Sequence, residues 1–174
     1  PLYGLKYPEI KVWGQGYIGM IPVPIILTVI IFGISAYLFY KTKFGRYTVS
    51  IGSNEEAAKL VGINVDKIKI LVFVLSGVFC AIAGIILASR SEAAIPTAGN
   101  AYEMDAIAAT VIGGTSMSGG KGNMFGTALG AILMATIKNG LSLLNVNTFW
   151  HQVVIGLFIL FAVALDGFAA KKVN

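Results

Sequence analysis

The sequence predicts an all-α integral membrane protein, a multi-span helical bundle with one broken helix and a short cytoplasmic helix. Of its 174 residues, 56% are hydrophobic and only 12% are charged. Soluble domains are about 45–50% apolar and about 25% charged. Long uncharged runs alternate with short polar segments, and cations gather beside the runs, which is typical of the cytoplasmic ends of membrane spans.

The same composition excludes several classes of protein. Cys80 lies in an apolar run and His151 has no neighbouring ligand, so we expect neither a disulfide framework nor a metal site. No nucleophile and base stand together, and the net charge of +5 comes without the basic-aromatic motif of a nucleic-acid binder. We therefore predict no catalytic, cofactor-binding or metal-binding residues. His151 is either a proton carrier or, more commonly for its position, an interfacial histidine.

The chain opens with aromatic residues interleaved with glycines over residues 1–20, a mixture that suits an interfacial loop. Residues 22–40 are uncharged and long enough to cross a hydrocarbon core of about 30 Å. Pro22 and Pro24 fall in the first turn, where proline costs little. These residues form the first predicted span.

A polar insert, residues 41–69, follows as a predicted cytoplasmic loop that holds one short helix over residues 53–62. Ser53 can cap this helix, with Glu56 three residues later completing a capping box. Gly62 supplies the stop. The helix therefore has defined ends.

The faces of this short helix differ. Ala57, Leu60 and Val61 share one side at helical spacing, and Glu55 and Lys59 form an i, i+4 pair on another. A helix this short is unstable alone in water. We expect its apolar side to rest on another surface.

After a second span at residues 70–89, residues 101–118 form a broken segment. Glu103 and Asp105 open an apolar piece too short to cross, and the run GGTSMSGGKG interrupts it. Irregular backbone at membrane depth occurs where protein buries it or where it lines a water-filled cavity. The break is therefore either a discontinuous helix at a helix interface or translocation path, or an ordinary cytoplasmic loop.

The glycine run does not match a nucleotide-binding loop. Thr115 occupies the first glycine position before Gly120 and Lys121, and Gly122 replaces the hydroxyl residue that would hold magnesium. We expect no ATPase within this chain.

Two further spans are predicted at residues 123–143 and 149–166. Gly122, Gly126 and Gly130 repeat every four residues, a pattern that favours close helix packing. Lys138 is the one charge inside these spans and either snorkels to the interface or faces the bundle interior.

Topology follows from the cations. Residues 41–69 contain a cluster of them, namely Lys41, Lys43, Arg46, Lys59, Lys67 and Lys69. The positive-inside tendency places this cluster in the cytoplasm together with Lys171 and Lys172. An even number of crossings must separate the two, which requires the broken segment to count as a full crossing.

Three motifs carry a family resemblance: FGRYTVSIGSNEEAAKLVGIN, YEMDAIAATVIGGTSMSGGKGNMFGTALGA and NGLSLLNVNTFWHQVVIGLFILFAVALD. Their order and spacing over about residues 16–166 resemble the permease subunit of bacterial ATP-binding-cassette (ABC) importers for monosaccharides, of the ribose and galactose type. The resemblance implies that residues 1–174 are the C-terminal half of one permease domain in the bacterial inner membrane.

The resemblance also implies partners and sites. The partners are an ATP-binding subunit, a periplasmic or lipoprotein sugar-binding protein, a second permease copy in a homodimer and the lipid bilayer, with no nucleic acid. Coupling to the ATPase falls to Ser53, Asn54, Glu55, Glu56, Ala57, Ala58, Lys59, Leu60, Val61 and Gly62. The substrate path is expected at Thr110, Gly113, Gly114, Thr115 and Ser116.

Two positions depart from the family pattern, since Ser53 replaces a usual second glycine and Met104 replaces a leucine. The alternative function is a secondary transporter or channel-like membrane protein for another small polar solute. Such a transporter needs an intramembrane ionisable residue for coupling, and Lys138 and Asp105 are the available candidates.

Overall fold

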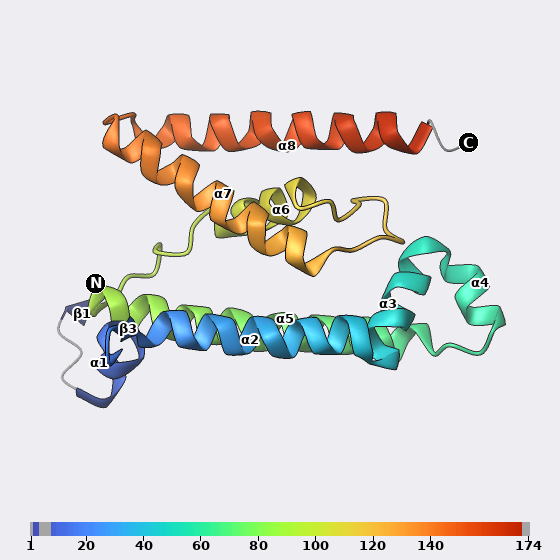
Figure 1. Cartoon of the computed structure of the whole chain (residues 1–174), viewed down its shortest axis with the longest axis horizontal. Coiled ribbons are helices and arrows are strands. Elements are labelled where there is room, and N and C mark those ends of the chain that lie inside the picture. The colour runs from blue at the N-terminus through green and yellow to red at the C-terminus, as the bar shows by residue number, and fades with distance from the viewer. Residues whose placement is uncertain (1, 4–7, 172–174) are drawn as a thin grey trace. The chain divides into compact units, whose positions relative to one another are not determined.

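The structure, a computed structural model, describes residues 2–3 and 8–171 and is almost entirely helical (Figure 1). The helices are α1 (Pro8–Gln15), α2 (Val23–Lys41), α3 (Lys43–Ser53), α4 (Glu55–Leu60), α5 (Val65–Ser91), α6 (Tyr102–Ile112), α7 (Met124–Leu143) and α8 (Thr148–Lys171). Four two-residue strands are β1 (Leu2–Tyr3), β2 (Tyr17–Ile18), β3 (Ile21–Pro22) and β4 (Ala93–Ala94). The predicted all-α fold is confirmed.

Among the described residues, three helices are long and apolar enough to cross a membrane: α2, α5 and α7. A shorter apolar stretch, Trp150–Ala164, lies within α8. Helix α6 has 11 residues. At about 1.5 Å per residue it reaches roughly half of a ~30 Å hydrocarbon core.

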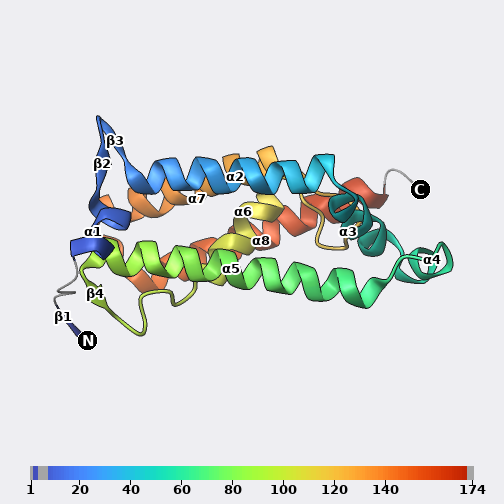
Figure 2. The same cartoon turned by 90° about the horizontal axis from the view of Figure 1, so that it is seen from below.

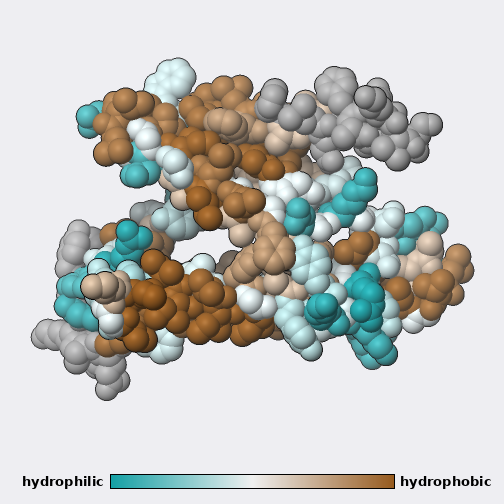
Figure 3. Space-filling model, in the orientation of Figure 1, coloured by the Kyte–Doolittle hydropathy of each residue, from teal (hydrophilic) through white to brown (hydrophobic). Residues whose placement is uncertain are grey.

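The chain divides into two compact units, Pro1–Thr48 with Val61–Asn100 and Val49–Leu60 with Ala101–Asn174. In the first unit, α2 and α5 run antiparallel, which Figure 2 shows most clearly. Helix α1 packs on both of them. Apolar side chains such as Ile25 and Val29 stay exposed on α2, and Figure 3 shows the resulting apolar band. Such a surface suits a lipid environment.

The beginning of the chain corrects one expectation. Residues 1–20 are not a simple loop, because α1 and the β2–β3 hairpin occupy most of the described part. The hairpin pairs Tyr17 with Pro22 and Ile18 with Ile21, and Gly19 turns it with a φ of 65°. The Val23 N–H donates to the Gly16 carbonyl at 2.8 Å, which attaches the hairpin directly to α2.

The predicted loop at residues 41–69 is also corrected. Helix α3 fills its first part, and α5 begins at Val65 rather than near residue 70. Asn64 caps α5 by accepting a hydrogen bond from the Lys67 N–H at 3.1 Å. Phe44, Tyr47 and Ile51 recur at helical spacing in α3. This spacing is typical of an amphipathic helix, but the surrounding cations and the Gly-Ser-Asn turn signal favoured a loop.

Polar contacts hold α1 against the end of α5. Lys11 Nζ lies 3.0 Å from Glu92 Oε2, and Gln15 Nε2 donates to the Arg90 carbonyl at 3.2 Å. Gly14 lies so close to Ser89 that an added Cβ would come within 2.6 Å of the serine Oγ. The Lys11 ammonium, as hydrogen-bond donor and as charge, lowers the pKa of Glu92 below its ordinary value of 4.5, and Gln15 adds a hydrogen bond.

We expect acid to loosen this contact. A carboxyl whose pKa is lowered by folding stabilises the folded arrangement above pH 4.5, and this contribution is lost as the pH falls through the lowered pKa. Trp13 fluorescence in a Trp150→Phe background should therefore change on acidification below pH 4.5. Glu92→Gln should remove that transition, and an identical transition in the variant would contradict the assignment.

The second unit is built around α6, which packs on α7 and α8. Its core contains Ala108, Ala109, Met134 and Ile155, each at most 5% exposed. Small residues on α6 allow α7 to approach closely. The end of α3 and all of α4 belong to this same unit.

Candidate functional site

The short helix predicted for coupling is α4, and its first cap differs from the prediction. Asn54 Oδ1 accepts from the Ala57 N–H at 2.9 Å, and the Asn54 carbonyl accepts from the Ala58 N–H at 3.1 Å. Ser53 is the last residue of α3, so the predicted Ser53 capping box is wrong. An N-cap needs non-helical backbone, and asparagine caps as well as serine does. Gly62 ends the turn with a φ of 82°, as predicted.

The faces of α4 match the predicted pattern with one addition. Glu55 Oε1 lies 2.9 Å from Lys59 Nζ, which confirms the i, i+4 pair. Leu60 and Val61 are 89% and 76% exposed, whereas Ala58 is 3% exposed. Ala58 is therefore buried against other residues of the chain, whereas the larger apolar side chains of Leu60 and the following Val61 are exposed. Ala57 and Glu56 are also exposed.

The predicted break begins where α6 ends. The Gly113 N–H donates to the Ala109 carbonyl at 3.0 Å, and Gly114 reverses the backbone with a φ of 86°. The Thr115 N–H then donates to the Thr110 carbonyl at 3.0 Å. The chain from Gly113 to the start of α7 is irregular but hydrogen-bonded, which identifies it as an ordered turn.

The predicted path residues therefore lie together around one turn, with Thr110 one step back on α6. The Thr110 hydroxyl donates to the Ile107 carbonyl of its own helix at 2.8 Å. Thr115 Oγ1 accepts from the Asn123 N–H at 3.3 Å and lies 3.5 Å from Thr127 Oγ1. Sequence reasoning missed Asn123 and Thr127, although asparagine before an apolar run is an ordinary N-cap signal.

The glycine stripe is shorter than predicted. Helix α7 begins at Met124 with Asn123 as its cap, so Gly122 lies outside the helix. Gly126 and Gly130 are on the helix and meet α6 main chain. A Cβ on Gly126 would overlap the Gly113 carbonyl, and one on Gly130 would overlap the Ala109 carbonyl.

Lys138 faces the bundle interior and does not snorkel. Its ammonium pairs with the Asp105 carboxylate of α6 and lies 5.4 Å from the centroid of the Tyr102 ring. Asp105 Oδ1 and His151 Nε2 are both buried without a hydrogen-bond partner among the described residues. His151 is 9% exposed, so its side chain is buried within the protein, and its position at the membrane interface stays a prediction.

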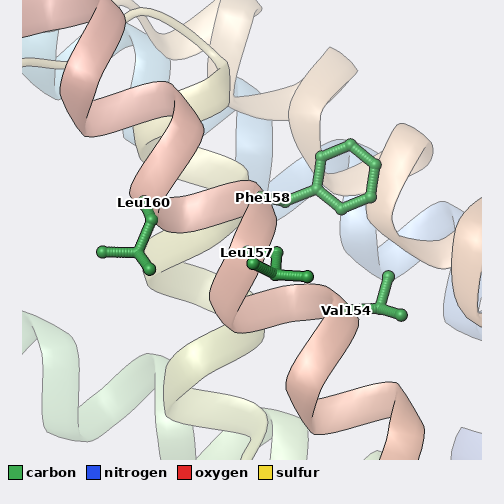
Figure 4. A pocket seen from close by; sticks show the side chains of 4 residues that line it. All are labelled: Val154, Leu157, Phe158 and Leu160. Carbon is green, nitrogen blue, oxygen red and sulfur yellow. The ribbon is translucent and has the colours of Figure 1, made fainter.

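The remaining features of the described residues do not form a metal site or a polar binding site. No group of three His, Cys, Asp or Glu side chains among them could hold a metal ion. An open depression on α8 is lined by Val154, Leu157, Phe158 and Leu160 (Figure 4). All four side chains are apolar, which suits a lipid tail or another helix better than a polar solute. Asp166 and Lys171, expected near the cytoplasmic end, have no described side-chain positions, and Lys172 lies outside the described residues.

The sequence matches known proteins over most of its length. Residues 6–163 match the family model described as the branched-chain amino acid transport system / permease component. The chain is 50% identical over 156 residues to the ribose import permease protein RbsC of Bacillus subtilis (strain 168), covering 90% of this chain and 48% of the relative.

Two relatives from Haemophilus influenzae (strain ATCC 51907 / DSM 11121 / KW20 / Rd) are similarly close. Its ribose import permease protein RbsC is 46% identical over 91% of this chain and 49% of the relative. Its xylose transport system permease protein XylH is 47% identical over 87% of this chain and 40% of the relative. The chain therefore spans about half the length of the curated relatives it matches, or less. No solved structure matches it significantly.

Proposed function

Because the chain belongs to the family of branched-chain amino acid transport system / permease components, we propose that it forms part of the membrane passage of an ABC importer for a monosaccharide. It is a multi-pass helical protein of the inner membrane, in keeping with its family and its apolar helices. The observation that carries the proposal is the 50% identity to a permease named for ribose import, over 90% of the chain. The relatives' names favour a sugar of the ribose class over a branched-chain amino acid.

We propose further that residues 53–62 dock on the ATP-binding subunit from the cytoplasmic side. The exposed Leu60 and Val61 support this role, since large apolar side chains exposed in a polar segment mark a protein interface. The Glu55–Lys59 pair stiffens the helix beside them. Helices α3 and α5 flank this segment along the chain, so a displacement of α4 acts directly on α5 and, through α3, on α2.

The solute path is proposed at the turn that follows α6. Irregular backbone is tolerated at membrane depth where protein buries it or where it lines a water-filled cavity, and the second case is the one proposed here. Gly114 is exposed there, Gly113 and Thr115 are half-buried, and Ser116 follows directly. In this assignment the α6 segment counts as a short crossing, and sugar arrives from an extracytoplasmic binding protein. A second permease copy completes the passage. In this chain, Gly126 and Gly130 allow α7 to pack closely on α6 beside it.

The rival function is a secondary transporter, in which ion movement replaces ATP. Its coupling residue would be Asp105 or Lys138. Their mutual pairing favours a structural role over ion coupling, because each charge is already neutralised inside the bundle. Dependence of uptake on ATP rather than on an ion gradient separates the two functions.

Reversing Glu55 and Glu56 to lysine should remove ATP-dependent sugar uptake. The change places positive charge at the positive end of α4 and breaks the pair with Lys59. We expect co-purification of the ATP-binding subunit and sugar uptake to fall together, by about tenfold or more for a loss of roughly 1.4 kcal/mol in docking. The measurements are pull-down of the ATP-binding subunit and uptake of labelled ribose and xylose by the assembled importer.

Glu103→Lys is the matched control, because Glu103 is also an exposed first-turn acid but lies on α6. It should leave co-purification unchanged. Unchanged co-purification in the Glu55 and Glu56 variant would remove the docking assignment. Uptake that persists without ATP would overturn the importer itself.

A further inference from the structure

A second segment of the chain touches the coupling region. The glycine loop, residues 116–121, lies against the end of α3, although more than sixty residues separate them in sequence. A Cβ on Gly52 would stand 2.9 Å from the Gly120 amide nitrogen and 3.4 Å from the Gly119 Cα. A Cβ on Gly120 would stand 3.1 Å from the Ser53 Cα. Figures 1 and 2 both show the chain before α7 reaching the end of α3.

Between Gly52 and Gly119 this contact is made by main chain on both sides, and the Ser53 side chain lies beside Gly120. Gly119 and Gly120 have φ values of 86° and 75°, a backbone conformation that residues other than glycine rarely adopt. The Ser116 N–H donates to the Lys121 carbonyl at 3.2 Å, and the Gly119 N–H donates to the Ser116 carbonyl at 3.3 Å. The loop is therefore a closed turn that meets the Gly52 backbone directly and the short Ser53 side chain beside it.

The other end of the glycine loop is tied to α6 and α7. Thr115 precedes the loop and bonds through its N–H to the Thr110 carbonyl, and its hydroxyl accepts from the Asn123 N–H. Asn123 Oδ1 in turn caps α7 by accepting from the Gly126 N–H at 3.0 Å. A continuous chain of short contacts thus runs from the residues just before α4 to the turn at Gly113.

We propose that the glycine loop is a second mechanical link, which transmits displacement of the coupling segment to the turn between α6 and α7. The proposal rests on the proposed importer function and adds a positioning role for Gly52, Gly119 and Gly120. Covalent connection already joins α4 to the α2 and α5 side of the chain. The glycine loop joins it to α6 and α7, where the solute path is proposed.

The physical basis of the link is the close packing of the two backbone segments. Closely packed main chain deforms little, so a shift of the end of α3 must move the loop or break the contact. A link of this kind couples two sites when each favours a different arrangement of the same packed element. It also accounts for the glycine run that fails as a nucleotide-binding loop, since close approach of two backbones needs glycine on both sides.

Gly52→Ala tests the link in the assembled importer. Gly52 is helical, so alanine adds a Cβ against the Gly120 amide without straining its own backbone. We expect sugar taken up per ATP hydrolysed to fall about tenfold, which corresponds to about 1.4 kcal/mol and lies in the lower half of the usual overpacking range. Co-purification of the ATP-binding subunit should be unchanged, because the exposed face of α4 is untouched. Gly120→Ala, which adds a Cβ against Ser53 from the other side, should have the same effect.

Two controls match these variants. Gly33→Ala changes a helical glycine, and Gly19→Ala changes a glycine with a φ of 65°. At both positions nothing lies within 4 Å of an added Cβ. Both should retain the wild-type ratio. A wild-type ratio in Gly52→Ala would overturn the link, and so would loss of the ATP-binding subunit, which would make the loop part of the docking surface. Absence of ATP-dependent uptake in the wild type would instead mean that the proposed function fails.

Discussion

Replacing Gly126 by leucine is expected to prevent α6 and α7 from packing. A single Cβ at this position already overlaps the Gly113 carbonyl, and Asn123 Nδ2 would lie 2.9 Å away. Because the obstacle is main chain, no side-chain rotation can relieve it. We expect a destabilisation at or above the upper end of the ~1–3 kcal/mol usual for overpacking. The measurement is the thermal unfolding midpoint of the purified protein in detergent, together with its yield from membranes.

Gly140→Leu is the control on the same helix. Gly140 has nothing within 4 Å of an added Cβ and lies within α7, as Gly126 does. The two variants share hydrophobicity, helix and side-chain volume, and they differ in what the side chain meets. Equal unfolding midpoints would show that α6 does not restrict Gly126, and the assigned packing of the second unit would be wrong.

The spans and the short helix α4 were predictable because their signals are local. An uncharged run predicts α2 from its own residues, and Gly62 ends a helix because of its own backbone freedom. The fourfold spacing of Gly126 and Gly130 predicted close packing, which the structure supplies through α6. For α2 and Gly62 the deciding interaction lies within a few residues of the pattern, whereas the glycine spacing predicted that α7 packs closely without identifying α6 as its partner.

The missed features depend on competition between neighbours or on distant contacts. Ser53 and Asn54 are both strong N-caps, and the choice between them depends on where α3 ends. Helix α3 was predicted as loop because its cations made the segment look polar throughout. The opposition of Gly52 and Gly119 cannot be derived from spacing along the chain, since it exists only once the turn after α6 is folded.

The ion pair inside the second unit is a further case of this kind. Asp105 and Lys138 are 33 residues apart, and each taken alone suggested either an interfacial charge or a coupling residue. Only the packing of α6 on α7 brings them together. Their opposite charges compensate each other between α6 and α7.

Replacing Lys138 by methionine should destabilise the second unit more than removing both charges does. Methionine keeps the length of the side chain but leaves the Asp105 carboxylate half-buried without its counterion. Breaking a buried pair costs about 3–5 kcal/mol. Here the two side chains are 31% and 21% exposed, so we expect about 2–3 kcal/mol. The unfolding midpoint in detergent measures this loss.

The double variant Lys138→Met with Asp105→Asn shows whether the unpaired Asp105 charge causes the loss of stability. An amide needs no counterion, so most of the lost stability should return if the unpaired charge is the cause. Lys67→Met, an exposed lysine outside this pair, controls for the loss of a cation and should change little. If the double variant is instead as unstable as the sum of both single variants, the two residues act independently. The pair would then not determine how α6 sits on α7.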